Sequence, residues 1–329
     1  MVIPYPQMLD HNSFKESRQS KSKSYSTPIS TSLTTVTVQL PPYASFWRGQ
    51  FTSSSSVEVE PGSYELESYN MKHENRGYAV IINNKTFDPR LGFSDRAGSD
   101  VDASAIYQRF QELGFETDLL NDVTKEEIVE KLKDRASDDE FNQKSDCFAC
   151  CILTHGGQDD ALFAVDGEMK LEDFMKPFLS SKSKSLLLKP KIFIIQACRG
   201  QKMSGGQEAI DLNVSDAGAD HTEYNEALNQ KGQHCQRFRV PDEADFLLVY
   251  SSFAGRQSIR NTNKGSPFIQ FLSDEISKLT EETNIYKVLT NVNRSFLKYR
   301  SDSQNLADKT QIPCFESTLT KTLKIGLKD

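Results

Sequence analysis

Short apolar runs and longer mixed stretches alternate along the chain from about Gly77 onward. Six apolar runs predict strands, at residues 77–83, 116–120, 146–153, 191–196, 245–252 and 312–320. The intervening stretches predict helices, at residues 99–115, 124–136, 171–179, 266–279 and 285–299. Such an alternation predicts an α/β sandwich, in which helices cover both faces of a largely parallel sheet.

Two of these predicted helices begin with a capping sequence. The first opens with Ser99-x-x-Asp102, and the second opens with the capping box Thr124-x-x-Glu127. In both patterns a short polar side chain accepts a hydrogen bond from a backbone N–H that the first helical turn leaves free.

The first part of the chain has a different composition. Residues 12–56 contain 13 Ser and 6 Thr, and a segment of this kind buries too little apolar surface to offset its ordering entropy. We therefore expect residues 1–68 to be a mostly disordered leader. The alternative is a mitochondrial transit peptide, because the segment is rich in Ser and poor in acidic residues, but its opening "MVIPYPQMLD" contains no Arg.

Composition and charge exclude several classes of protein. The net charge of −7 argues against nucleic acid as the main partner, and no 18-residue apolar run predicts a membrane span. No secretory signal is recognisable, and Val2 replaces the Gly that myristoylation requires. We interpret the six Cys as reduced thiols of a cytoplasmic protein. A zinc site at Cys147 and Cys150 is the alternative, although no second pair follows at finger spacing.

Two predicted strands end in residues that can carry chemistry. The strand at 146–153 runs into "THGG", which contains His155, and the strand at 191–196 runs into "ACRG", which contains Cys198. Functional sites of open α/β sheets lie at the carboxyl ends of strands, so neighbouring strands would bring these two side chains together. A thiolate is a nucleophile, an imidazole can activate it, and Gly156 leaves backbone N–H groups free to approach an oxyanion. From spacing alone, a buried cysteine and a structural histidine are an equally good interpretation.

Several longer motifs distinguish these interpretations. The motifs, in chain order, are "IINNKTF", "RAGSDVDA", "LTHGG", "FIIQACRG", "PDEADFLLVYSS", "IRNTNKGSPFIQFL" and "QIPCFESTLTK". With them the chain resembles a caspase from about Tyr69 to Asp329, and "QACRG" is a signature of that family. The resemblance implies a three-layer sandwich with about six mostly parallel strands, and a cysteine endopeptidase that cleaves proteins after Asp, acts in apoptosis and needs no metal or organic cofactor.

The resemblance also assigns roles to residues. It implies that Cys198 is the nucleophile, that His155 is the general acid and base, and that the N–H groups of Gly156 and Cys198 form the oxyanion hole. A pocket for the substrate Asp is implied at Arg96, Gln196 and Arg260, because guanidinium groups hold a carboxylate through paired, charge-assisted hydrogen bonds.

The substrate strip "SFAGRQSIRN" departs from the family pattern. Ser258, Arg260 and Asn261 are implied to contact the peptide, whereas Gln257 and Ile259 stand where the family often carries aromatic residues. Pro267 replaces a frequent Trp, and the loop 300–310 has no aromatic residue. We therefore expect a looser or more polar P2 pocket and weaker discrimination at P4.

The long polar loop at residues 201–239 follows directly after Cys198. By the resemblance it is an intersubunit linker that is cut after Asp216, with Asp220 as a second site. The chain is then a zymogen with a large subunit at 69–216 and a small subunit at 217–329. Asp10 is the only Asp before Asp88, so a cut after Asp would leave most of the leader attached; otherwise the leader is removed after a Glu such as Glu67, or retained.

The partners are also implied by the resemblance. They are protein substrates with Asp at P1, an upstream activating caspase, inhibitor-of-apoptosis proteins, and a second copy that forms a homodimer of large and small subunits. The leader is too short and too polar for the death-fold modules of initiators, which favours an executioner-like enzyme.

Two alternative functions remain open. The first is a catalytically weak caspase homologue that regulates a relative by binding it, because Gly157 stands where the family usually has Glu. The second is a more distant cysteine–histidine peptidase that cleaves after Lys or Arg. Its pocket would need carboxylates where Arg96 and Arg260 stand.

Overall fold

The computed structural model describes residues 67–205, 239–301 and 309–328, all within one compact unit, residues 63–329. The leader, apart from residues 67 and 68, and the linker positions Asp216 and Asp220 lie outside these described residues.

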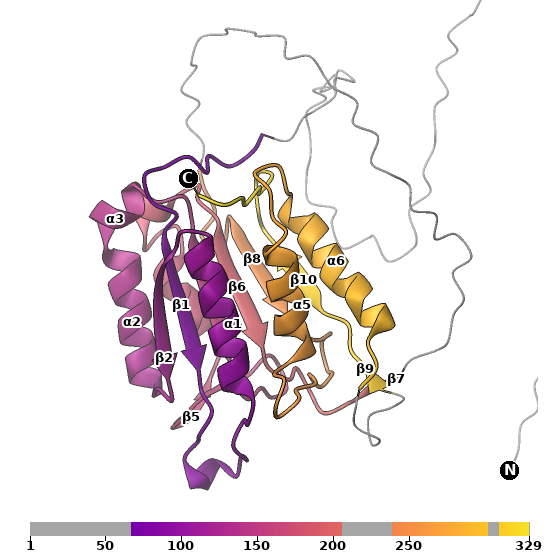
Figure 1. Ribbon diagram of the computed structural model, residues 1–329. Helices are drawn as coiled ribbons and strands as arrows, with labels where there is room; N and C mark the ends of the chain where they lie inside the picture. Colours follow the sequence, from indigo (N-terminus) through magenta and orange to yellow (C-terminus); the bar gives the residue numbers. More distant parts are fainter. Residues whose placement is uncertain (1–66, 206–238, 302–308, 329) are drawn as a thin grey trace, which may run out of the picture. The chain divides into compact units, whose positions relative to one another are not determined.

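A six-stranded sheet forms the centre of this unit (Figure 1). Its order is β10-β8-β6-β3-β1-β2; neighbouring strands run parallel except β10, which is antiparallel to β8. The strands are β1 (Tyr78–Asn83), β2 (Glu116–Asn121), β3 (Phe148–Leu153), β6 (Lys191–Gln196), β8 (Phe246–Tyr250) and β10 (Cys314–Ser317). All six strands predicted from the sequence are confirmed, with boundaries shifted by a few residues.

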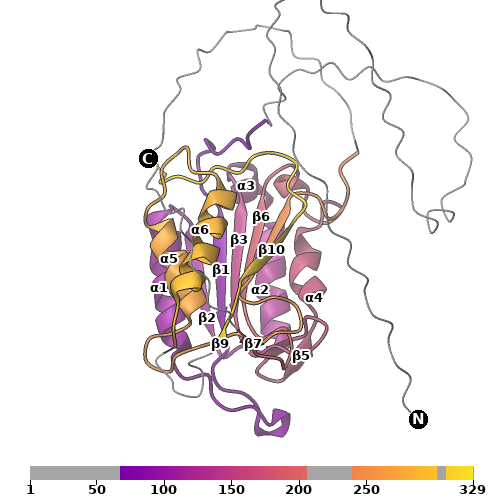
Figure 2. The same ribbon diagram turned by 90° about the vertical axis from the view of Figure 1, so that its right-hand side faces the viewer.

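Helices cover both faces of the sheet, so the prediction of a three-layer sandwich is confirmed (Figure 2). On one face lie α1 (Ser99–Glu112), α5 (Pro267–Ile276) and α6 (Ile285–Lys298). The other face is covered by α2 (Lys125–Ser137), α4 (Leu171–Met175) and the short helices η3 (Lys176–Phe178) and η4 (Lys184–Leu186). The remaining helices are α3 (Asp139–Gln143) and η2 (Pro89–Leu91).

The alternation of side chains along β3 shows how one strand serves two cores. Ala149, Cys151 and Leu153 face α1, α5 and α6, whereas Phe148, Cys150 and Ile152 face α2 and α4. All six side chains are at most 1% exposed, because helices exclude water from both faces. This explains why the strand is apolar throughout rather than alternating in polarity.

Two small two-stranded sheets were not predicted from the sequence. β4 (Leu162–Ala164) pairs antiparallel with β5 (Gly167–Met169), and β7 (Ser204–Gly205) pairs antiparallel with β9 (Lys309–Thr310). The second pair joins the segment that follows Cys198 to the segment that precedes β10.

The predicted cap at Ser99 is wrong. Gly98, at φ +87°, is the N-cap of α1 and provides no side-chain hydrogen bond, so Ser99 is the first helical residue. Asp102 instead accepts a hydrogen bond from the N–H of Ser266, 164 residues away. The capping box of Thr124 and Glu127 is confirmed at the start of α2.

The predicted helix at 171–179 is divided. α4 ends at Met175, and residues 176–178 form a 3-10 turn with Pro177 in its first positions. Proline lacks the N–H that a continuing α-helix would use, which accounts for the break.

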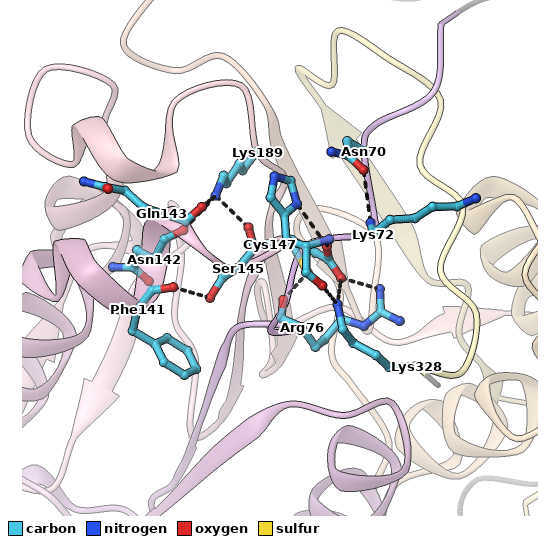
Figure 3. A network of polar contacts seen from close by, with 12 residues as sticks. Asn70, Lys72, Arg76, Phe141, Asn142, Gln143, Ser145, Cys147, Lys189 and Lys328 are labelled. Carbon is cyan, nitrogen blue, oxygen red and sulfur yellow. Dashed lines mark hydrogen bonds and ion pairs between the residues drawn. The ribbon is translucent and has the colours of Figure 1, made fainter.

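A buried ionic network ties Arg76 and Lys328 to the amino end of β3 (Figure 3). Asp146 is fully buried, and its carboxylate lies 2.7 Å from Nζ of Lys328 and 3.2 Å from Nη1 of Arg76. Nearby, Nζ of Lys189 donates to the carbonyls of Asn142, Gln143 and Ser145 at 2.6–2.8 Å. This network therefore secures the end of the sheet opposite to the predicted site.

Within the described ranges, no helix is long and apolar enough to cross a membrane, and no group of His, Cys, Asp and Glu could hold a metal ion. The five described cysteines are all free thiols.

Candidate active site

The ends of β3 and β6 bring His155 and Cys198 to the same edge of the sheet. The strands pair in parallel with Leu153 opposite Gln196, and each functional residue follows its strand end by two positions. The N–H of Thr154 donates to the carbonyl of Gln196 at 3.2 Å, which extends this pairing toward the site.

Gly156 lies directly against the backbone of Cys198. A Cβ atom at position 156 would lie 2.0 Å from the carbonyl oxygen of Cys198, so no larger residue fits there without displacing the chain. The N–H groups of Gly156 and Cys198 donate to no other described residue. Two free backbone donors therefore lie beside the thiol, as an oxyanion hole requires.

The His155 ring is held by a hydrogen bond and by aromatic contacts. Its Nε2 lies 2.9 Å from the carbonyl oxygen of Ser94, so a proton on Nε2 would leave Nδ1 as the free base. The ring stacks on Phe93 with centroids 4.7 Å apart and lies 4.9 Å from the ring of Phe87. Phe163 supports Phe93 through an edge contact at 4.6 Å.

Cys198 is partly exposed at the end of β6. Its Sγ accepts a hydrogen bond from the N–H of Ser258 at 3.4 Å. The segment that carries Ser258 therefore passes directly beside the thiol, and this places the sequence-predicted substrate strip next to the sequence-predicted nucleophile.

The three residues predicted to bind the substrate Asp lie near the thiol of Cys198; they are Arg96, Gln196 and Arg260. Arg96 is fully buried; its Nη1 donates to the carbonyl of Asn84 at 2.9 Å, while its Nε and Nη2 have no partner. Gln196 donates through Nε2 to Oγ of Ser258 at 2.9 Å, and its Oε1 has no partner. Nε of Arg260 donates to the carbonyl of Ala97 at 3.0 Å. Neither guanidinium forms an ion pair with any carboxylate in the described part of the chain.

The pKa values in this region follow from burial and from the two positive charges. Burial and the charge of Arg260 lower the pKa of Arg96 to about 9, and burial also lowers the pKa of Arg260. The pKa of His155 lies below its ordinary value of 6.5, mainly because of burial and also because of both arginines. Burial raises the pKa of Asp102 to about 6. The two arginines and burial therefore make the imidazole of His155 less basic than a free one.

The remaining residues of the predicted strip have different surroundings. Ile259 is 5% exposed, and its N–H donates to Oε1 of Gln311 at 2.5 Å. The side chain of Asn261 accepts hydrogen bonds from the N–H groups of Asn263 and Lys264, which shapes the following turn. The N–H of Gln257 donates to the carbonyl of Lys202 at 2.9 Å. The backbone N–H of Ile259 and the side-chain oxygen of Asn261 therefore form hydrogen bonds that fix the conformation of the strip itself.

Three residues at the site were not predicted from the sequence. Ser94 contributes a backbone carbonyl, for which the side-chain type gives no signal. Phe93 could have been suspected only as an apolar residue within a polar loop. Asp102 belongs to the motif "RAGSDVDA", but its burial beside Arg96 and Arg260 depends on the tertiary fold.

Comparisons with known sequences and structures all point to the same family. Residues 76–324 match the family model described as "Caspase domain". The chain is 37% identical over 276 residues to caspase-3 of Mesocricetus auratus, covering 83% of this chain and 92% of that protein. It is 35% identical over 258 residues to caspase-7 of Gallus gallus, covering 78% and 79%. The crystal structure of caspase-1 from Spodoptera frugiperda superposes with a TM-score of 0.67 at 31% identity, covering 82% of this chain and 99% of that structure.

Proposed function

The chain belongs to the caspase family, and we propose that it is an active cysteine endopeptidase that cleaves proteins after Asp. In this proposal Cys198 is the nucleophile, His155 is the general acid and base, and Arg96, Gln196 and Arg260 hold the substrate's Asp side chain.

One observation carries the proposal: two guanidinium groups lie beside a cysteine with no carboxylate paired to either of them. Buried polar atoms are hydrogen-bonded in most proteins, yet Nε and Nη2 of Arg96 have no partner. A substrate carboxylate would supply the missing acceptor and charge. A neutral side chain would leave both cations unpaired, which supports discrimination in favour of Asp.

The proposed reaction uses the groups already described. His155, neutral near pH 7 because its pKa is lowered, removes the thiol proton of Cys198 through Nδ1. The thiolate attacks the main-chain carbonyl carbon of the substrate Asp, whose C–N bond to the next residue then breaks, and the N–H groups of Gly156 and Cys198 stabilise the oxyanion formed before that bond breaks. Protonated His155 then gives its proton to the leaving amine, and water hydrolyses the acyl-enzyme.

Other parts of the proposal concern assembly and regulation. β10 is an edge strand; Phe315 within it and Ile312 just before it are 38% and 39% exposed, which favours pairing with a second copy. We propose a cytoplasmic zymogen in apoptosis, cut at Asp216 or Asp220 by an upstream caspase and open to inhibitor-of-apoptosis proteins. Family membership supports these features.

The test is hydrolysis of matched fluorogenic tetrapeptides that end in Asp, Asn or Glu, by wild-type protein and by Cys198→Ala. The proposal expects cleavage of the Asp peptide alone, and no cleavage by the variant. A folded protein that stays inactive even after its linker is cut would instead support the regulatory homologue.

A further inference from the structure

The hairpin that carries His155 turns through two strained residues. Phe163 N–H donates to the carbonyl of His155, Gly156 bridges to Leu162, and the N–H of Ala161 closes the turn onto the carbonyl of Gln158 at 3.0 Å. The two central residues of that turn, Asp159 and Asp160, have φ values of +52° and +56°. Tight hairpin turns with positive φ at both central positions favour Asn, Asp or Gly at the first position and Gly at the second, so Asp160 at the second position requires an explanation.

Asp160 has a specific partner beyond the turn. Its carboxylate forms a two-point contact with the guanidinium of Arg199, with Oδ1 at 2.5 Å from Nε and Oδ2 at 2.6 Å from Nη2. Paired bonds of this kind are the strongest and most directional that arginine forms. Asp159 forms no two-point contact of this kind with any residue that the structure describes. The two neighbouring aspartates therefore share a conformation and differ in their contacts.

Arg199 is fixed from several sides. Its side chain is 7% exposed, its guanidinium carbon lies 3.7 Å from the centroid of Tyr250, and its Nη1 lies 3.3 Å from Sγ of Cys314. Its backbone N–H and carbonyl bond to Arg256 and Gly255 at 2.9 and 2.8 Å. Because Arg199 directly follows Cys198, its position constrains the backbone that carries the thiol.

We propose that Asp160 is a positioning residue for the cysteine–histidine pair, because it clamps the tip of the histidine hairpin onto the residue next to Cys198. This inference rests on the proposed function. Without the clamp, the hairpin between His155 and Phe163 would be held to the thiol-bearing segment by the contact of Gly156 with Cys198 and by the apolar packing of Leu162, neither of which fixes the tip of the turn. Asp160 thus fixes the distance between the imidazole and the thiol without touching the substrate.

The test compares Asp160→Asn with Asp159→Asn in the full-length protein. Both changes keep a residue that tolerates positive φ and both remove one negative charge from the same turn, but only the first removes the clamp. Two quantities are measured: kcat and KM on the Asp-ended peptide, and the pH dependence of alkylation of Cys198 by iodoacetamide, with the modified cysteine identified by mass spectrometry.

Asp160→Asn is expected to lower kcat by about 10-fold or more with KM changed less than about twofold, because the pocket arginines are untouched. Its alkylation by iodoacetamide should be slower than in the wild type, because a displaced imidazole takes the thiol proton less readily. Asp159→Asn should match the wild type in both measurements. Equal behaviour of the two variants would overturn the proposal.

Asp160→Glu provides a second measurement if Asp160→Asn does not fold. It keeps the charge but moves the carboxylate by one methylene, so it should fold and show a reduced kcat with an unchanged KM; an unchanged kcat would contradict the clamp. Alkylation is measured without substrate. A wild-type protein that cleaves nothing would therefore count against the proposed function, while the alkylation profiles would still decide the role of Asp160.

Discussion

Replacing Arg96 by Met should change activity and stability in opposite directions. The guanidinium is fully buried, and its pKa of about 9, against an ordinary 12.5, corresponds to roughly 5 kcal/mol that disfavours the charged form, at about 1.4 kcal/mol per pKa unit. Met has a similar length and no charge, so it removes this cost.

The gain in stability is smaller than that penalty. Met also removes the hydrogen bond from Nη1 to the carbonyl of Asn84, and leaving that buried carbonyl unpaired costs about 1–3 kcal/mol. The net expectation is a stabilisation of about 2–4 kcal/mol, which for a domain of this size raises Tm by at least about 4 °C. Cleavage of Asp peptides should fall by about 100-fold or more, because each lost charge-assisted hydrogen bond contributes about 1.5–3 kcal/mol.

The assay combines thermal unfolding with kcat/KM on the Asp peptide, for the wild type, Arg96→Met and the control Arg90→Met. Arg90 is an exposed arginine paired with Asp88, so its replacement should leave both quantities nearly unchanged. A lower Tm for Arg96→Met would show that Arg96 stabilises the fold. Retained cleavage would show that Arg96 does not bind the substrate Asp. Either result would refute the reasoning.

Three further predictions concern other parts of the chain. Burial lowers the pKa of His155, so the acid limb of the pH profile of kcat/KM should have its midpoint below pH 6.5. Phe93→Ala exposes the imidazole to water and should move that midpoint to higher pH. An unchanged midpoint would contradict this role for Phe93. Phe315→Lys on β10 should convert a dimer into a monomer in sedimentation velocity. The control, Leu297→Lys, changes a residue of α6 that is 71% exposed and should leave the dimer intact. Equal effects of the two variants would contradict pairing through β10. Thr124→Ala should lower the free energy of unfolding by about 1 kcal/mol in a denaturant titration with no change in kcat, and an unchanged midpoint would argue against the capping box.

The fold was largely predictable because its determinants are local. β1, β3, β6 and β8 are short apolar runs, and the capping box at Thr124 lies within four consecutive residues. The sequence misled where a local signal was used elsewhere. Ser99-x-x-Asp102 has a capping pattern, yet Asp102 accepts a hydrogen bond from the N–H of Ser266 and the N-cap of the helix is Gly98.

The site was predictable only in part, because its geometry is not local. The family motifs predicted His155 and Cys198, and the strand register confirms that their strand ends are adjacent. The roles of these residues remain proposals. No sequence pattern indicates that the carbonyl of Ser94 holds the imidazole. Nor does any sequence pattern pair Asp160 with Arg199. The two residues are 39 positions apart, and only the fold brings them together.

Some of the buried polar atoms without a partner belong to the predicted pocket. In the described residues, nine buried side-chain atoms have no hydrogen-bond partner, and two of them are the donors Nε and Nη2 of Arg96. A fold selected for stability alone would pair such atoms or replace them with apolar groups, as it does along β3. Arg96 lies within electrostatic range of Cys198 and of a second cation, Arg260, so a carboxylate ligand would best satisfy these two donors, as the proposed function requires.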